Sequence, residues 1–234
     1  MDHISGLLKK IRSNFETYAA RTLWIKVKAG KHKRLLFNSS QRYLDSKINE
    51  QLAQTGKVRV LVLKGRQQGV STYTEGRFYY QVTGGFGRKA FILTHEDKAT
   101  KNLFGMASRY HERMDPALKP STKRDSSTEL FFDKLDSGYG VGTARSKGTG
   151  RSDMIQYFHG SEVAFWPNQD EHLAGILQAL PNAPGTEAIL ETTANGKEMF
   201  YDLWQEAERG KNQWWPIFIP WYWQEEYRID NYPA

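Results

Sequence analysis

Short apolar runs alternate with longer amphipathic stretches along most of the chain. The runs are five or six residues long and rich in β-branched or aromatic side chains, which is typical of buried strands. The stretches between them have helical length, and one places Leu103, Met106 and Tyr110 on a single face. We predict strands at 58–63, 89–94, 154–158, 187–192 and 215–219, and helices at 70–82, 97–114, 168–180 and 198–209.

This alternation predicts the fold class. Strands that alternate with helices form βαβ units, so we expect an α/β protein with a mainly parallel central sheet flanked by helices. A strand pair is predicted at 129–132 and 139–143, and a short amphipathic helix at 1–20. We divide the chain into a basic N-terminal helix and arm at 1–36, packed on or preceding the core, and a core domain at 37–234.

The charge distribution sets the N-terminal segment apart. The 234 residues include 33 Lys and Arg against 26 Asp and Glu, yet residues 1–43 hold ten of the basic residues and only two of the acidic ones. The remainder of the chain is therefore close to neutral. A concentrated basic segment suits phosphate polyanions, because each neutralised phosphate releases counterions. A solvated basic surface or a flexible arm is the alternative interpretation.

Composition excludes several classes of protein. The absence of Cys rules out a disulfide scaffold, a cysteine nucleophile and a thiolate metal site, and fits a reducing compartment. No window of eighteen apolar residues and no signal-peptide pattern occur, so we expect neither a membrane-spanning nor an exported protein. The six His show no pairing with carboxylates at metal-site spacing, which argues against zinc.

The segment VLVLKGRQQGVSTY contains the most informative motif. An apolar strand runs into a loop with two glycines, and a helix follows directly. Loop amides and a helix N-terminus cradle phosphates, and a hydroxyl at the helix start holds Mg²⁺. Val70 stands where a standard phosphate loop has lysine, so Arg66 is the first candidate for the cation and Lys64 the second. An ordinary strand–helix turn is the alternative. The predicted nucleotide-binding residues here are Gly65, Arg66, Gln67, Gln68, Gly69, Val70, Ser71 and Thr72.

Two later strands end in groups that suit nucleotide hydrolysis. HGSEVAFW ends a strand in Ser161 and Glu162, where phosphate-loop enzymes place an acidic pair for the Mg²⁺ shell and the attacking water. Glu162 fits the water-activating role, and Ser161 would reach the metal weakly or through water. ETTANG ends another strand in Thr192 and Thr193, where hydroxyls could sense the γ-phosphate. A surface glutamate and a threonine-rich strand are the corresponding bland interpretations.

The order and spacing of the three motifs resemble the large terminase subunit of tailed bacteriophages, the ATPase that pumps DNA into procapsids. RQQGVST resembles that family's Walker A motif, HGSEVAFW its Walker B motif and ETTANG its coupling motif. The resemblance covers about residues 35–220. It implies a P-loop NTPase of the RecA/ASCE type that uses ATP and Mg²⁺. The implied metal-site residues are Ser71, Ser161 and Glu162, and the implied coupling residues are Thr192 and Thr193.

The resemblance also implies roles that spacing alone does not show. Gln41, in FNSSQRYL, is placed like the family's adenine-recognition segment. Arg151, in GTARSKGTGRSD, is placed like an arginine finger that acts in a neighbouring subunit's site, with Arg145 as the second candidate. The implied catalytic residues are thus Glu162, Arg151 and Arg66.

The implied partners are double-stranded DNA, a portal protein, a small terminase subunit and further copies of the chain in a ring, with no membrane. The implied location is the host cell cytoplasm, transiently at the procapsid portal vertex. Full-length relatives carry a nuclease domain, but no second sheet is predicted after Leu190, so we assign no nuclease activity. A helicase-like ATPase that tracks single strands is one alternative. A DNA-binding or assembly module with an inactive nucleotide site, suggested by Val70 and Ser161, is another.

Overall fold

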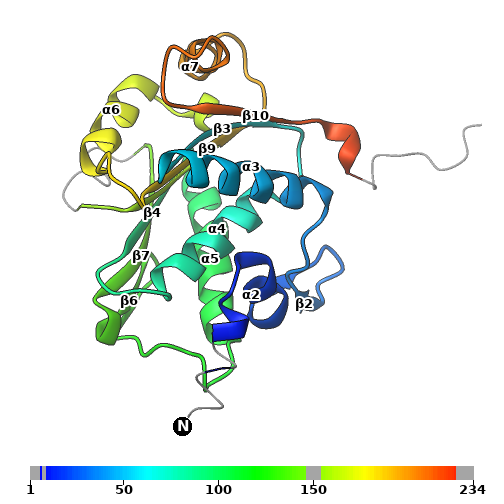
Figure 1. The fold of residues 1–234 in the computed structure, drawn as a ribbon, viewed down its shortest axis with the longest axis vertical. Helices are drawn as coiled ribbons and strands as arrows, with labels where there is room; N and C mark the ends of the chain where they lie inside the picture. The colour runs from blue at the N-terminus through cyan, green and yellow to red at the C-terminus, as the bar shows by residue number, and fades with distance from the viewer. Residues whose placement is uncertain (1–5, 7–8, 146–153, 225–234) are drawn as a thin grey trace, which may run out of the picture.

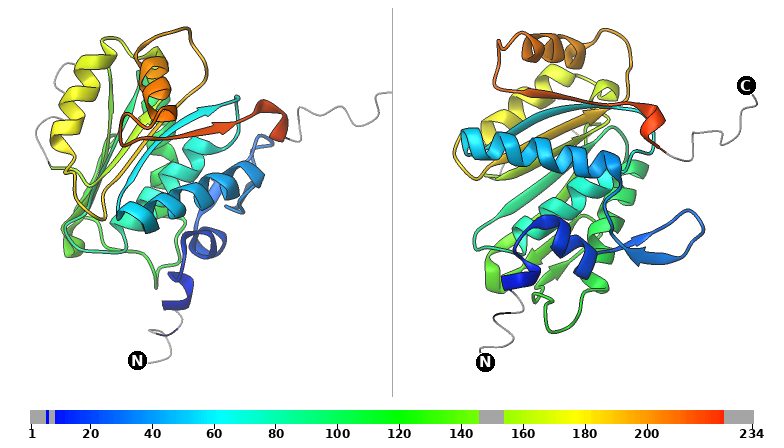
Figure 2. Two further views of the ribbon diagram at one scale, coloured as in Figure 1. Left: turned by 45° about the horizontal axis from the view of Figure 1, so that its top comes forward. Right: turned by 45° about the vertical axis from the view of Figure 1, so that its right-hand side comes forward.

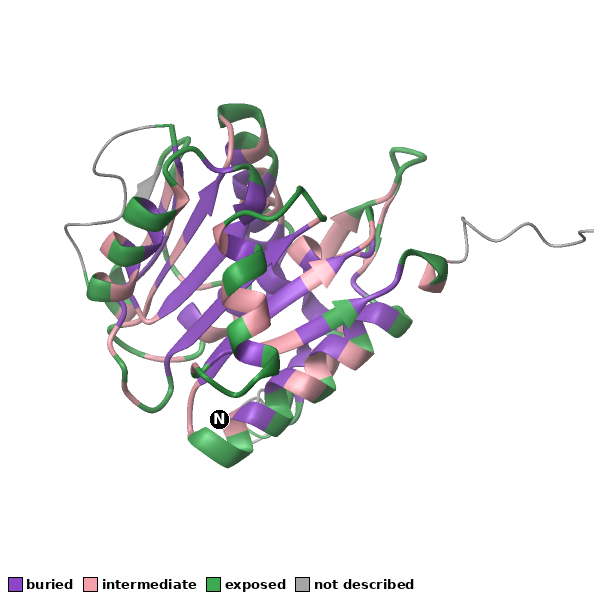
Figure 3. Cartoon of the chain, turned by 90° about the horizontal axis from the view of Figure 1, so that it is seen from above, coloured by how far each residue is buried: buried purple, intermediate pink, exposed green. Residues whose placement is uncertain are grey.

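Neighbouring side chains of strand β3 (Val58–Lys64) pack into two different hydrophobic cores. The computed structural model describes residue 6 and residues 9–145 and 154–224. Val60 and Val62 pack with helices on one side of the sheet, whereas Leu61 packs with helices on the other. Successive strand side chains point to opposite faces, so an almost continuously apolar strand is buried on both. The described chain forms three layers, with the mostly buried strands between two layers of helices (Figure 3).

Within the described residues, eight strands form one sheet in the order β10–β3–β9–β8–β4–β7–β6–β5. The six strands from β10 to β7 are parallel, and β6 and β5 continue the sheet antiparallel at one edge. The predicted mainly parallel sheet flanked by helices is confirmed. The strands besides β3 are β4 (Lys89–Thr94), β5 (Arg124–Asp125), β6 (Glu129–Phe132), β7 (Ser137–Thr143), β8 (Tyr157–Ser161), β9 (Glu187–Thr192) and β10 (Trp215–Ile219).

Helices α2 to α5 cover one face of the sheet, and α6 and α7 cover the other (Figures 1 and 2). None of the described helices is long and apolar enough to cross a lipid bilayer. The α-helices are α2 (Phe15–Thr22), α3 (Ser39–Thr55), α4 (Val70–Val82), α5 (Asp97–Glu112), α6 (Gln169–Ala179) and α7 (Met199–Glu208). The 3-10 helices are η1 (Asp133–Leu135), η2 (Val163–Phe165) and η3 (Trp221–Trp223).

The N-terminal segment differs from the single helix predicted at 1–20. Helix α2 starts afresh at Phe15, because the Asn14 side chain accepts a 2.8 Å hydrogen bond from the Thr17 amide and caps the new helix. Phe15 is buried in the same core as α4. After α2 the chain forms a hairpin of β1 (Trp24–Lys26) and β2 (His32–Arg34). The basic arm thus packs against the core.

Two elements of the core were missed or misplaced by the sequence patterns. Helix α3 was not predicted, because its few buried apolar residues, such as Leu44 and Ile48, leave a narrow stripe on a polar helix. Strand β8 covers Tyr157–Ser161 rather than 154–158, because pairing with β4 and β9 extends it over His159 and Gly160; its end at Ser161 agrees with the strand end that the motif HGSEVAFW indicates. Both shifts follow from tertiary contacts overriding local propensity.

Candidate active site

The loop between β3 and α4 requires glycine at both ends. A Cβ on Gly65 would lie 2.6 Å from the Trp221 Cα, so the backbone of η3 leaves no room for a side chain. Gly69 has φ 79° directly before the first turn of α4, in the left-handed region that favours glycine. The loop therefore joins a parallel strand to a helix N-terminus in the tight form expected of a phosphate loop.

Side chains from α3 hold this loop from one side. The Gln41 Nε2 donates to the Gly69 carbonyl at 2.9 Å, while the Gln41 Oε1 accepts from the Asn38 amide at 3.0 Å. The Ser40 hydroxyl donates to the Gln68 Oε1 at 2.8 Å. Gln41 and Gln68 are both buried. The structure thus brings Gln41, the predicted adenine-recognition residue, into direct contact with the phosphate loop.

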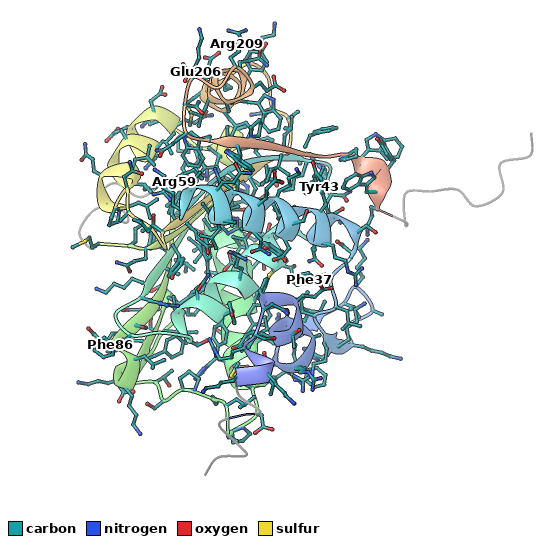
Figure 4. The ribbon with its side chains drawn as sticks, viewed as in Figure 1. Phe37, Tyr43, Arg59, Phe86, Glu206 and Arg209 are labelled. Atoms are coloured by element: carbon teal, nitrogen blue, oxygen red, sulfur yellow. The ribbon has the colours of Figure 1, made fainter. Side chains whose placement is uncertain are left out.

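The C-terminal 3-10 helix holds the loop from the other side. Gln68 Nε2 donates to the Trp221 carbonyl at 3.1 Å. Helix η3 is itself fixed on α3, where Tyr43 meets Trp223 edge to face with ring centroids 5.1 Å apart; Tyr43 is labelled in Figure 4. Of the tryptophans near the C-terminus, Trp214 is buried, whereas Trp221 is exposed.

A cavity of about 540 Å³ opens beside the loop. The hairpin β1–β2, the end of β3, the first turn of α4, helix α5 and the end of β8 form its walls. The predicted nucleotide or metal residues that line it are Gln67, Gln68, Gly69, Val70, Ser71, Thr72, Ser161 and Glu162. Three lysines of the basic arm, Lys26, Lys28 and Lys33, line it too. Three of the ten basic residues of segment 1–43 therefore lie at the cavity beside the loop.

The two candidate cations of the loop lie in different environments. Lys64 lines the cavity, and its side chain is only 7% exposed, whereas Arg66 is exposed and does not contribute to the cavity wall. The Lys64 Nζ lies 2.8 Å from an oxygen of Glu162 and 2.8 Å from an oxygen of Glu191. Burial opposes the charge, but these two carboxylates raise the pKa of Lys64 above its usual range. Lys64 therefore stays charged within the site.

Glu162, directly after β8, contacts the segment that follows β9. Its backbone is left-handed, with φ 52° and ψ 50°, which turns the side chain at the junction of β8 and η2. One carboxylate oxygen contacts Lys64, and the other accepts from the Thr193 amide at 3.0 Å and the Thr193 hydroxyl at 3.2 Å. Thr192 instead accepts from the Ala164 amide at 3.3 Å. Glu162 and Thr193, two predicted site residues, are thus in direct contact.

Glu191 is a site residue that the sequence motifs did not single out. It is fully buried on β9, and one of its oxygens accepts from the Ser71 hydroxyl at 2.7 Å and the Ser161 hydroxyl at 3.0 Å. Burial opposes its charge, but Lys64 and His159 lower the pKa of Glu191 below its usual range. A glutamate that directly follows the apolar centre of a strand, Ala188–Leu190, was the available signal.

A buried chain of polar groups continues from Glu191 between the sheet and α4. The His159 Nε2 lies 3.4 Å from Glu191, and its Nδ1 lies 2.6 Å from Glu75 of α4. Glu75 in turn accepts a hydrogen bond from the Tyr139 hydroxyl. Burial opposes protonation, yet hydrogen bonds and charges of Glu191 and Glu75 raise the pKa of His159 to about 9. His159 is therefore a cation at neutral pH.

Of the two arginine candidates, one lies within the described residues. Arg151 lies outside the described residues. Arg145 is exposed just after the end of β7. Among the described residues, no group of three or more His, Asp and Glu side chains could hold a metal ion. Mg²⁺ at nucleotide sites is commonly bound by one or two protein groups together with phosphates and water. Such a site therefore does not require a group of three His, Asp or Glu side chains.

No protein-family model matches the chain. Among solved structures, the large terminase of bacteriophage HK97 matches with a TM-score of 0.70 and 14% identity, over 88% of this chain and 43% of its own. The large terminase ATPase domain of Thermus phage P74-26 matches with a TM-score of 0.61 and 15% identity, over 75% of this chain and 82% of its own. The UvsW helicase of bacteriophage T4 has a TM-score of 0.55 and 14% identity, over 89% of this chain and 67% of its own.

These similarities establish the fold. The chain has the α/β fold of large terminase ATPase domains, and the phage helicase shares it. The chain spans less than half the length of the HK97 large terminase. The large terminase of a thermophilic bacteriophage, with a TM-score of 0.59 and 9% identity over 82% of this chain and 47% of its own, was solved in complex with ATP-gamma-S.

Proposed function

We propose that the chain hydrolyses ATP to drive double-stranded viral DNA into a procapsid, as the ATPase part of a large terminase. One observation carries the proposal. Lys64, Glu162 and Thr193 belong to three different motifs and meet at the carboxyl ends of three parallel strands. Ligands of open α/β sheets bind at this edge. The fold of the HK97 and P74-26 proteins supports the choice of motor.

Nucleotide binding rests on the loop and the charges around it. The loop amides and the N-terminus of α4 offer donors to phosphates, and Lys26 and Lys33 add positive charge from the hairpin. Arg66 was the first candidate for the missing P-loop lysine. Burial at the cavity wall makes Lys64 the better placed cation, because its charge is less screened by water than that of Arg66. We assign Gln41 to adenine recognition and to holding the loop.

Hydrolysis rests on Glu162 and on the hydroxyl of Ser71. Glu162 is 26% exposed beside the cavity, where its carboxylate can orient a water and accept its proton. Ser71 and Ser161 fit a Mg²⁺ site, because both hydroxyls line the cavity and point their protons at Glu191. Bound Mg²⁺ would neutralise charge on the phosphates. Arg151 of a neighbouring subunit is the proposed arginine finger.

Coupling rests on the two hydrogen bonds from Thr193 to Glu162. A change in the charge around Glu162 when the γ-phosphate leaves reaches the segment after β9 directly. The proposed partners are duplex DNA, a portal protein, a small terminase subunit and further copies of the chain in a ring. The proposed location is the host cell cytoplasm, transiently at the portal vertex.

Stimulation of ATP hydrolysis by DNA tests this function. We expect duplex DNA to stimulate turnover more than single-stranded DNA of equal nucleotide concentration. The opposite order would favour a helicase-like ATPase, an alternative that the fold of UvsW supports. Absence of nucleotide binding in a calorimetric titration would instead favour an assembly module with an inactive site.

A further inference from the structure

The strand that carries Glu162 has a serine where its resemblance to a Walker B motif calls for a carboxylate. In the sheet, Ser161 of β8 is paired directly with Glu191 of the parallel neighbour β9. The Ser161 hydroxyl donates to the Glu191 carboxylate at 3.0 Å. The carboxylate missing from one strand is therefore present at the same level of the adjacent strand.

We propose that Glu191 supplies the carboxylate of the Mg²⁺–nucleotide site in place of the residue at Ser161. The inference rests on the proposed function, since it concerns how the same site holds its metal. Phosphate-loop enzymes hold Mg²⁺ through the loop Ser or Thr and an acidic residue on a second strand. Here the acidic residue comes from the coupling strand.

The hydroxyl of Ser71 is oriented for this role. Ser71 lies in the first turn of α4, lines the cavity and donates its proton to Glu191 at 2.7 Å. A hydroxyl has one proton and two acceptor lone pairs. Because Glu191 takes the proton, the lone pairs of Ser71 remain available to a cation in the cavity.

The charges around Glu191 also fit a metal site. The Lys64 ammonium lies 2.8 Å from the Glu191 carboxylate and 2.8 Å from that of Glu162, so one cation holds two carboxylates together. A triphosphate that takes up the charge of Lys64 leaves Glu191 to be balanced by a divalent cation. Mg²⁺ suits this position, because it is commonly bound by one or two carboxylates together with substrate phosphates and water.

Glu75 provides a matched control within the same polar chain. Like Glu191 it is fully buried, contacts His159 and does not itself line the cavity. Unlike Glu191, it lies on the other side of that ring, and the contacts to Ser71, Ser161 and Lys64, which do line the cavity, are made by Glu191. Removing its charge perturbs the buried network without touching the proposed site. A purely structural role of Glu191 would make the two glutamates equivalent.

Calorimetric titration of ATP-gamma-S at a series of Mg²⁺ concentrations tests the proposal. We expect Glu191→Gln to raise, by roughly tenfold or more, the Mg²⁺ concentration at which the gain in ATP-gamma-S affinity is half-maximal. This is the usual cost of losing an outer partner of a metal site. Affinity in EDTA should be unchanged or higher, because a negative charge is removed. Glu75→Gln should shift the Mg²⁺ dependence by less than about twofold. Wild-type Mg²⁺ dependence in folded Glu191→Gln would overturn the proposal.

An exchange variant moves the carboxylate between strands. Ser161→Asp combined with Glu191→Gln should recover Mg²⁺ dependence to within about threefold of wild type, because the two positions are side by side. Failure to recover in the folded exchange variant would overturn the equivalence of the two positions. Loss of all nucleotide binding in the wild type would instead contradict the proposed function itself.

A measurement on the wild-type protein needs no variant. Crystals grown with ADP and Mn²⁺ should show an anomalous peak next to Ser71 and within about 5 Å of the Glu191 carboxylate, the reach of one bound water. A peak beyond that reach would overturn the proposal even if Glu191→Gln failed to fold.

Discussion

Strand β9 carries two buried glutamates, one near each end, and both face helix α4. Glu187, at the start of the strand, accepts from Arg77 at 2.7 and 3.0 Å. Glu191, near its end, accepts from Ser71 at 2.7 Å and pairs with Lys64 at 2.8 Å. The two glutamates share a face because side chains four apart on a strand point the same way. They are alike in burial and differ in partners.

The two glutamates of β9 pair with different kinds of cation. The planar guanidinium of Arg77 forms a two-pronged contact that fixes Glu187 in one geometry, whereas the lysine ammonium is a point charge on a flexible stem. Both pairs are buried, but Lys64 lines the cavity at the carboxyl ends of the strands, whereas neither Arg77 nor Glu187 lines it. Burial and ion pairing alone therefore do not distinguish these two glutamates. Their positions along the parallel strand do, and the metal-site role is proposed for Glu191 on that ground.

The largest expected effect is at the carboxyl end. Glu162→Gln should lower ATP turnover by ~10²–10⁴, because the amide cannot accept a proton from water. ATP affinity and the thermal unfolding temperature should change little, since the amide oxygen can still accept from Thr193. A steady-state ATPase assay beside calorimetry checks this. Turnover close to wild type would remove Glu162 from the mechanism and contradict a catalytic role of the carboxyl ends of these strands.

Substitutions in the Arg77–Glu187 pair, at the amino end of β9, should change the stability of the protein rather than its rate of ATP turnover. Arg77→Ala should lower the free energy of unfolding by about 3–5 kcal/mol, because it leaves Glu187 charged and buried without its main partner. Urea denaturation measures the loss. Combining Arg77→Met with Glu187→Leu should recover much of it, because no uncompensated charge remains. A stable Arg77→Ala protein with impaired turnover would contradict the division between the two ends.

The polar chain between the two ends should make stability depend on pH. The pKa of His159 is about 9 in the folded protein and ordinarily about 6.5, so its contribution is fully present below pH 6.5 and is lost as pH rises through 9. The loss should be on the order of 3 kcal/mol. Urea midpoints between pH 6 and 9.5 measure it. His159→Gln, which cannot be protonated between Glu75 and Glu191, should remove this dependence; an equally steep decline in the variant would assign it to other groups.

The sequence predicted the strand–loop–helix unit of β3 and α4 because all of its signals are local. An apolar strand, two glycines and a following helix are contiguous in the chain, and Gly69 has the left-handed backbone that such a loop needs. The parallel sheet was predicted for the same reason, from the alternation of runs. Helix α3 was missed because its apolar stripe is narrow, so its place depends on packing against β3 and α4.

Glu191 was missed because its role depends on strand register. Nothing near it in the chain shows that it lies beside Ser161, thirty residues away, or beneath the Ser71 hydroxyl. The proposed preference for Lys64 over Arg66 depends likewise on side-chain burial, which the sequence does not show. Contacts between distant parts of the chain therefore position those residues of the candidate site that the motifs did not identify.

The smallest expected effect compares the two cations of the loop. Lys64→Ala should weaken ATP binding roughly tenfold or more, because a charge-assisted contact in a buried setting is lost and two carboxylates are left facing the phosphates. Arg66→Ala should weaken it by about threefold or less, because an exposed charge is screened by water and salt. Calorimetry at low and high salt separates them, since only the Arg66 effect should fade as salt rises. A larger, salt-resistant loss in Arg66→Ala would return the phosphate contact to the loop, as the sequence first suggested, and leave Lys64 as a structural counterion like Arg77.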